Sequence, residues 1–366
     1  MLRSDMLRLS LWPRLVVVAS LSLSLSLSLA VAPARSQTGA PPPPSAAPAA
    51  NVVPAVVADP GAEQAPVPDI ILVTGQRPGP GLWKVSQGDH VLWVFGTYGP
   101  LPKNMEWRSQ QVETILAQSQ EYLKPPGMHA EVGFFKQVAM LPFAIGVKKN
   151  PDGATLKDLV PAPVYARWLV LKSKYLGEDD GIERERPIFA AATLYDQALR
   201  QADLYDGELS KSLGKLIKQS GIKQTDTQVK VAIDDPVTML REFKKTPLED
   251  AACFANTLAR LEDDIDAMRV RANAWAKGDL AVIEKLSYAD RCGACNTAVF
   301  NSAVMQSRPG MRSIEARIQE SWLAAAEKAL AANASTFATL SLNDLLDPKG
   351  AMAALQARGY VVEKPQ

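Results

Sequence analysis

Strand-like segments lie at the two ends of a region of about 285 residues, and mostly helical segments lie between them. At the N-terminal end, residues 81–85 and 90–97 flank a turn at 87–89, which predicts a β-hairpin. At the C-terminal end, residues 335–340 and 360–363 predict strands separated by a helix. We therefore expect an α/β (α+β) fold, with a mixed β-sheet formed by N- and C-terminal strands and a large helical insertion.

The middle of the chain, residues 131–286, has apolar residues three and four positions apart, which indicates amphipathic helices. We interpret the Trp, Met and Phe stripes in these helices, from FFKQVAML at 134–141 to the long run at 250–280, as core. A short strand is expected at 229–233. Further predicted elements are helices at 107–118 and 311–332 and a short strand at 122–123.

The N-terminus has the pattern of an export signal. Arg3, Arg8 and Arg14 precede an uncharged run at 15–32 that ends in small residues, which predicts a signal peptide over 1–36. The alternative is an uncleaved anchor, because the run reaches about 18 residues. A Pro/Ala-rich stretch at 37–78 is predicted to be a disordered linker, and the folded domain to span 79–366. The expected location is periplasmic or secreted.

The charge balance argues against a nucleic-acid partner. The chain has 40 Lys and Arg against 39 Asp and Glu, a net charge of +1, and so lacks the basic excess that attracts nucleic acid. Phosphate-binding loops, a dinucleotide fingerprint and a His-Glu-x-x-His motif are absent from the sequence. We expect no cofactor.

The three cysteines are Cys253, Cys292 and Cys295. In an oxidising compartment we expect Cys253 to bridge to Cys292 or to Cys295, which would link two helices and leave one thiol spare. Cys292 and Cys295 also have the spacing of a redox pair, but without a second such pair they cannot complete a zinc site.

Short motifs in order along the chain resemble the TraB/GumN family. They are GLWKV at 81–85, Gly96-Thr97 with Leu101-Pro102, Trp275-x-x-Gly278-Asp279, Arg308, Pro348-Lys349-Gly350 and Gly359-Tyr360-Val361. The resemblance covers about Gly81 to Val362. It implies two histidines at the ends of core strands that offer imidazoles to one divalent cation, and metal-dependent proteolysis in members related to the Tiki proteins. The gum-cluster name of other members hints at surface polysaccharide.

This chain departs from the family at both histidine positions. The first is Gly99 and the second is Asp344, so most of the expected ligands are missing. The histidines present are His90, expected at the far end of its strand, and His129, expected in a loop that approaches the crevice. We therefore expect no metal. Asp344 is alternatively a helix cap.

The sequence leaves three functions open. We expect a non-catalytic binding or accessory protein of the cell envelope, a pseudo-enzyme whose partner is a peptide, a glycan or an envelope protein. The first alternative is a hydrolase, metal-dependent or using Glu121 and Asp344 as acid and base. The second is a disulfide-dependent assembly factor. The candidate crevice consists of Gly96, Thr97, Tyr98, Gly99, Lys103, Ser341, Asp344 and Arg308.

Overall fold

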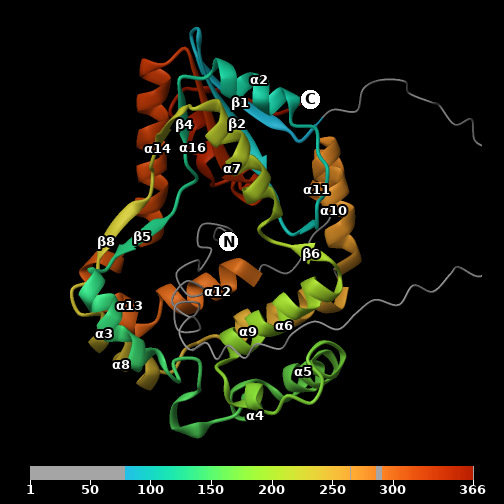
Figure 1. The fold of residues 1–366 in the computed structure, drawn as a ribbon, viewed down its shortest axis with the longest axis vertical. Helices are drawn as coiled ribbons and strands as arrows, with labels where there is room; N and C mark the ends of the chain where they lie inside the picture. The colour runs from blue at the N-terminus through green and yellow to red at the C-terminus, as the bar shows by residue number, and fades with distance from the viewer. Residues whose placement is uncertain (1–78, 264, 286–290, 366) are drawn as a thin grey trace, which may run out of the picture. The chain divides into compact units, whose positions relative to one another are not determined.

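The computed structural model describes residues 79–263, 265–285 and 291–365 (Figure 1). The predicted signal peptide and linker lie outside these residues. Within them, a sheet has six strands in the order β10-β1-β2-β9-β4-β7. Its strands are β1 (Leu82–Gln87), β2 (His90–Thr97), β4 (Glu121–Leu123), β7 (Lys223–Thr225), β9 (Ser335–Ser341) and β10 (Val361–Glu363). The mixed sheet of terminal strands is confirmed.

The sheet contains both antiparallel and parallel strand pairs. β1 is antiparallel to both β2 and β10, whereas β2, β9, β4 and β7 are mutually parallel. The β1–β2 hairpin closes at the pair Gln87 and His90, and Gly88 in its turn has a φ of 61°, a conformation that glycine adopts without strain. The central pair β2–β9 joins segments more than 200 residues apart in the chain.

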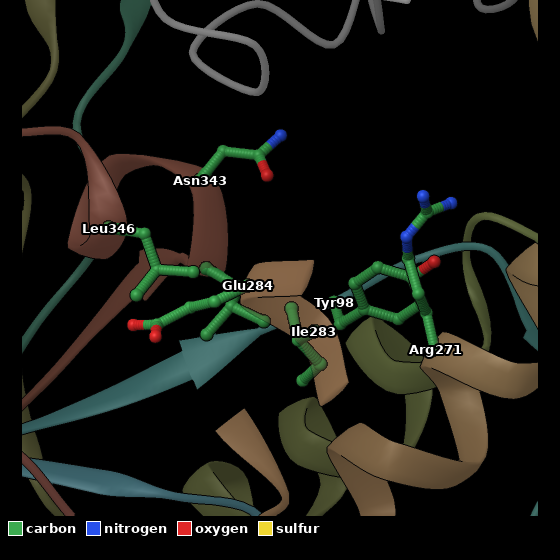
Figure 2. A pocket seen from close by; sticks show the side chains of 7 residues that line it. Tyr98, Arg271, Ile283, Glu284, Asn343 and Leu346 are labelled. Carbon is green, nitrogen blue, oxygen red and sulfur yellow. The ribbon is translucent and has the colours of Figure 1, made fainter. Parts of the chain in front are cut away.

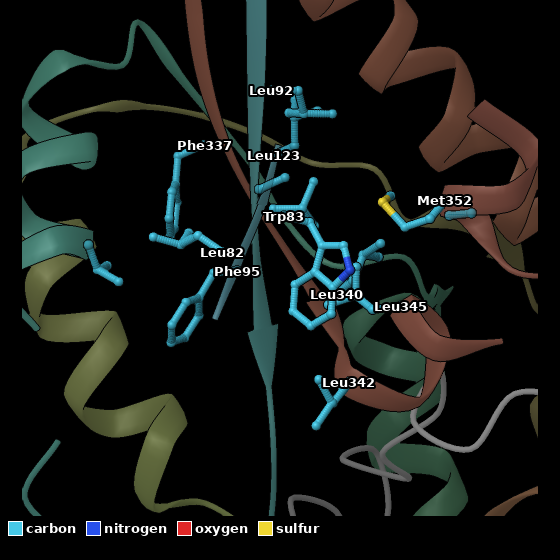
Figure 3. Close-up of a cluster of buried hydrophobic side chains, with 14 of the residues drawn as sticks. Leu82, Trp83, Leu92, Phe95, Leu123, Phe337, Leu340, Leu342, Leu345 and Met352 are labelled. Carbon is cyan, nitrogen blue, oxygen red and sulfur yellow. The ribbon is translucent and has the colours of Figure 1, made fainter. Parts of the chain in front are cut away.

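Helices cover both faces of this sheet (Figure 3). Phe95 and Phe337 project toward the face covered by α2 (Gln110–Gln118) and α7 (Glu208–Ser220). Trp83 and Leu340 project toward the other face, covered by α14 (Ile314–Ala332), α15 (Leu342–Leu346) and α16 (Ala351–Ala357). Because adjacent strand residues point to opposite faces, a sheet covered on both sides buries consecutive residues: β2 carries the apolar run VLWVF, and β9 is buried from Thr336 to Ser341.

The insertion is helical, as predicted. Its larger helices are α3 (Phe134–Ala144), α5 (Ala162–Tyr175), α6 (Pro187–Gln201), α8 (Pro236–Lys245), α9 (Ala251–Asp263), α10 (Ile265–Lys277), α11 (Leu280–Lys285) and α12 (Arg291–Phe300). Shorter helices are α4 (Leu156–Leu159) and α13 (Ala303–Gln306). Two small sheets join β3 (Leu101–Pro102) to β6 (Leu204–Tyr205) and β5 (Met128–Glu131) to β8 (Val229–Ala232).

The predicted core stripes are confirmed in most of these helices and wrong in one. Trp168 on α5 and Phe254 on α9 are buried and pack with tilted rings whose centroids lie 5.2 Å apart. On α3, however, Phe134 is 71% exposed and Phe135 is 86% exposed. The apolar pattern of α3 identified a helix correctly but did not reveal which of its faces the protein buries.

A disulfide links α9 to α12. It joins Cys253 to Cys295, with the two Cα atoms 4.5 Å apart, so one of the two predicted pairings is confirmed. The side chain of Cys292 lies outside the described part of the structure. Because Cys295 is bonded to Cys253, and Cys253 is fully buried, the pair Cys292 and Cys295 does not form the redox bridge that the assembly-factor alternative requires.

Candidate functional site

The parallel strands β2 and β9 end side by side, with Thr97 opposite Ser341. The Thr97 hydroxyl donates a hydrogen bond of 3.1 Å to the carbonyl oxygen of Leu340, which ties the two strand ends together. Tyr98 and Gly99 follow β2, and α15 follows β9 directly. The carboxyl ends of adjacent parallel strands are the usual position of a ligand crevice in α/β folds.

Ser341, rather than Asp344, caps α15. The Ser341 hydroxyl accepts a hydrogen bond from the Asp344 backbone N–H at 3.1 Å. The prediction that Asp344 caps the last helix is wrong, because it lies in the first turn of α15 and the N-cap residue of α16 is Gly350. Asp344 is buried, with 5% of its surface exposed.

The turn after α15 packs tightly against it. A Cβ atom at Gly350 would lie 2.3 Å from the carbonyl oxygen of Asp344 and 3.0 Å from that of Asp347. Both neighbours are backbone atoms, which cannot move aside as a side chain can. The Pro348-Lys-Gly350 motif therefore holds α15 in place at the end of β9.

The Trp275-x-x-Gly278-Asp279 motif holds two further helices against the same strand ends. Trp275 Nε1 donates a buried hydrogen bond of 2.7 Å to the carbonyl oxygen of Gly96. Gly278 ends α10 with a φ of 72°, and the Asp279 carboxylate accepts the Val282 N–H at 3.1 Å at the start of α11. Helix ends of these types favour Gly and Asp respectively. The motif thus places α10 and α11 beside the end of β2.

The strand-end pocket lies between these elements and has a volume of about 300 Å³. It is lined by Tyr98, Arg271, Ile283, Glu284, Leu342, Asn343 and Leu346 (Figure 2). The Arg271 guanidinium and the Asn343 amide extend toward the same side, whereas the Glu284 carboxylate lies apart from them. Glu284 also forms an ion pair of 3.3 Å with Lys364. Apolar walls with a few polar groups are typical of small-ligand sites.

Sequence analysis identified one side of this pocket and missed the other. Tyr98 is the one predicted crevice residue among those that line the pocket; Gly96, Thr97, Gly99, Ser341 and Asp344 lie at the strand ends but do not line it. The other lining residues were not predicted, and Arg271, Ile283 and Glu284 lie far from the strand ends in the sequence. Arg271 lies four residues before Trp275, on the same face of α10. The Trp275 motif could therefore have pointed to Arg271, because residues four positions apart on a helix lie on the same face.

Glu121 lies at the opposite end of the sheet. It opens β4 opposite Thr336, the second residue of β9, whereas Ser341 is the last residue of β9. Five residues of a strand span about 16 Å. The predicted proximity of Glu121 and Asp344 is therefore wrong, and the acid-base hydrolase loses its carboxylate pair.

Glu121 instead belongs to a network of hydrogen bonds and an ion pair at that end of the sheet. Its carboxylate accepts hydrogen bonds from Thr225 and, at 2.9 Å, from Asn333, and Lys223 lies 3.0 Å away. Burial raises the pKa of Glu121, but these hydrogen bonds and the Lys223 charge together lower it below the ordinary value. The carboxylate is therefore held ionised, which suits an ion pair and not a general acid.

Arg308 and Lys103 do not line the strand-end pocket. Arg308 precedes the 3₁₀ turn at Pro309–Met311 and forms an ion pair of 2.9 Å with Glu242 on α8, in the region of α8 and α13. Lys103 is exposed, and its backbone N–H donates a hydrogen bond to the backbone carbonyl oxygen of Asp203, next to the β3–β6 sheet. The prediction that these two cations belong to the crevice is therefore wrong.

The two histidines also lie outside the pocket. His90 opens β2, at the end opposite to Gly99, where its Nδ1 donates to the Leu330 carbonyl oxygen at 2.5 Å; its predicted position is confirmed. His129 is exposed in β5, paired with Lys230 of β8, so the prediction of a loop is wrong. The β5–β8 pairing could not be predicted from the sequence, because each strand has only four residues.

The residues at the strand ends do not suit the divalent cation that the resemblance implies. Gly99 has no side-chain donor, and Asp344 supplies one carboxylate. In the described part of the chain, no group of three or more His, Cys, Asp or Glu side chains is placed to hold a metal. A catalytic zinc needs three protein ligands and an octahedral cation needs more oxygens. We derive no metal-dependent step for this site.

The fold and the strand-end pocket define an α+β domain in which terminal strands form the sheet and an inserted helical region completes the crevice. The model of the TraB/PrgY/gumN family matches residues 81–364. The chain belongs to this family. No curated protein and no solved structure matches it significantly. Among residues 79–263, 265–285 and 291–365, no helix is both long and apolar enough to cross a membrane.

Proposed function

We propose that this protein is an exported, non-catalytic member of its family that binds a ligand of the cell envelope in the strand-end pocket. The observation that carries the proposal is the exchange of both histidine positions for Gly99 and Asp344 at strand ends that still form a lined pocket. A lined pocket without the ligand set that the resemblance implies favours binding over catalysis.

The pocket limits the kind of ligand. Its volume of about 300 Å³ lies at the small end of ligand sites, which span roughly 300–1,000 Å³. A short peptide segment or one end of a glycan suits this size better than a long polymer segment. The lining combines the polar side chains of Arg271 and Asn343 with an apolar wall that includes Leu342 and Leu346, so the ligand we expect has a polar group next to an apolar one.

The first experiment combines metal content with peptidase activity. The purified domain is expected to contain no stoichiometric metal by elemental mass spectrometry and to cleave no member of a peptide panel, with or without chelator. Gly99→His serves as a comparison for metal uptake, because a Cβ at Gly99 meets no atom closer than 3.5 Å. Tightly held metal with chelator-sensitive cleavage that Asp344→Ala abolishes would contradict the proposal.

The second experiment tests binding directly. Envelope peptides and glycan fragments are screened by thermal shift and then measured by calorimetry. Asn343→Ala is expected to weaken binding about tenfold, the effect of losing one or two hydrogen bonds, whereas Asn301→Ala, an exposed asparagine outside the pocket, leaves it unchanged. Equal effects of both variants, or no ligand in the screen, would count against a binding function. Export is checked by cell fractionation of the full chain.

A further inference from the structure

Helix α3 exposes an apolar face to solvent. At 100° per residue, Leu141, Phe134, Ile145, Val138, Pro142 and Phe135 cover an arc of about 120°. Phe134 is 71%, Ile145 76% and Phe135 86% exposed, and the two phenylalanine rings pack edge to face 5.7 Å apart. A stripe of this width normally faces a core.

The other face of α3 is already packed. Met140 is buried, and Phe143 packs with it against Leu240 and Phe243 of α8. Arg241 of α8 stacks over the Phe143 ring at 4.3 Å. Figure 1 shows α3 and α8 side by side. Because α3 is held in the fold by this second apolar face, its exposed face is a surface feature of a docked helix and not the result of a missing core contact.

Basic side chains lie at the C-terminal end of the exposed face. Residues 133–149 contain no acidic residue, and Lys148 and Lys149 follow the helix. Lys136 lies instead on the side of Phe143 at 100° per residue, where its Nζ donates to the Asp234 carbonyl oxygen at 2.6 Å. Lys244 and Lys245 end α8, and the Lys244 side chain lies near Gly146, just after α3.

The acidic residues nearby are partly neutralised. Glu242 on α8 is paired with Arg308, and Glu131 with Lys230. Asp234 and Asp235 lie at the start of α8, where Asp235 accepts the Thr238 N–H as the helix cap. Lys149 is itself paired with Glu185 at 3.8 Å. The positive charge near the C-terminal end of α3 therefore comes from Lys148, Lys244 and Lys245.

We propose that α3 docks this domain on an anionic phospholipid surface. An exposed apolar helix face with lysines at one end is typical of helices that lie in the membrane interface, where the apolar side chains enter the acyl boundary and the lysines contact head-group phosphates. A second copy of the chain would bring the same lysines face to face, which like-charge repulsion opposes. Lipid phosphate complements that charge. This inference is independent of the strand-end pocket.

The test uses flotation of the full mature chain with vesicles of phosphatidylcholine alone or with one-third phosphatidylglycerol. The protein is expected to float with the anionic vesicles and to be released by salt. The double variant Phe134→Ser and Phe135→Ser should bind at least about tenfold more weakly, because burial of one aromatic ring already supplies such a factor. The matched control, Val170→Ser on α5, replaces another residue that is 70% exposed and should bind as wild type.

The charge contribution is measured separately. Lys148→Ala and Lys245→Ala should each weaken binding to anionic vesicles by up to about fivefold at low salt. Circular dichroism should show unchanged folding for all of these variants, since each replaced side chain is exposed. Absence of vesicle binding by wild type, or equal binding by the double phenylalanine variant, would overturn the proposal. So would a wild-type dimer that the double variant converts to a monomer, because that result would assign the face to a second copy.

Discussion

Reduction of the Cys253–Cys295 bond should lower the free energy of unfolding by about 4 kcal/mol. The bond closes a loop with a sequence separation of 42, and the loss of chain entropy in the unfolded state for a loop of this length gives that magnitude at 25 °C. Reduction is a cleaner perturbation than substitution because it leaves both side chains in place. Cys253 is fully buried, so Cys253→Ser would add the cost of an extra polar group in the core.

The assay is denaturant unfolding followed by circular dichroism, with and without reductant. Reduction should lower the denaturant midpoint of wild-type unfolding. The double variant Cys253→Ser, Cys295→Ser should have a lower free energy of unfolding in both conditions and should be insensitive to reductant. Cys292→Ser is the control and should retain the full shift. If Cys292→Ser abolished the shift, or if reduction changed the unfolding free energy by less than about 1 kcal/mol, the pairing or the entropy argument would be wrong.

Three further predictions concern stability. Burial raises the pKa of Asp250 to about 6, more than the Ile188 N–H and Arg186 lower it. Its contribution to stability is therefore complete below pH 3.8 and is lost as pH rises through 6. The loss is about 3 kcal/mol, and Asp250→Asn should remove it from the pH profile of unfolding. Gly350→Ala should destabilise by about 2 kcal/mol in the same unfolding assay, because its Cβ meets the Asp344 carbonyl; a change below 0.5 kcal/mol would show that the turn relaxes. Trp275→Phe should cost about 1–3 kcal/mol, because it leaves the buried Gly96 carbonyl without its 2.7 Å donor, and thermal melting checks this.

Elements whose signals are local were predictable from the sequence. The β1–β2 hairpin and the closing β9, α16 and β10 were predicted to within a few residues, because alternation and turn chemistry act between neighbours in the chain. The predicted start of α14 at residue 311 differs from the observed Ile314 because a 3₁₀ turn at Pro309–Met311 precedes the helix. Helix ends of this kind depend on packing as well as on propensity.

The sequence by itself determined that the terminal strands form a mixed sheet around a helical insertion, and its motifs indicated the family. Tertiary structure alone decided which residues meet. The pairing of Glu121 with Thr336 put that carboxylate at the far end of the sheet, and helix packing selected Cys295 as the partner of Cys253. It also brought Arg271 to the pocket and left Phe134 in solvent. The physical reason is that period and composition specify the faces of an element, whereas register and docking depend on contacts between residues far apart in the chain.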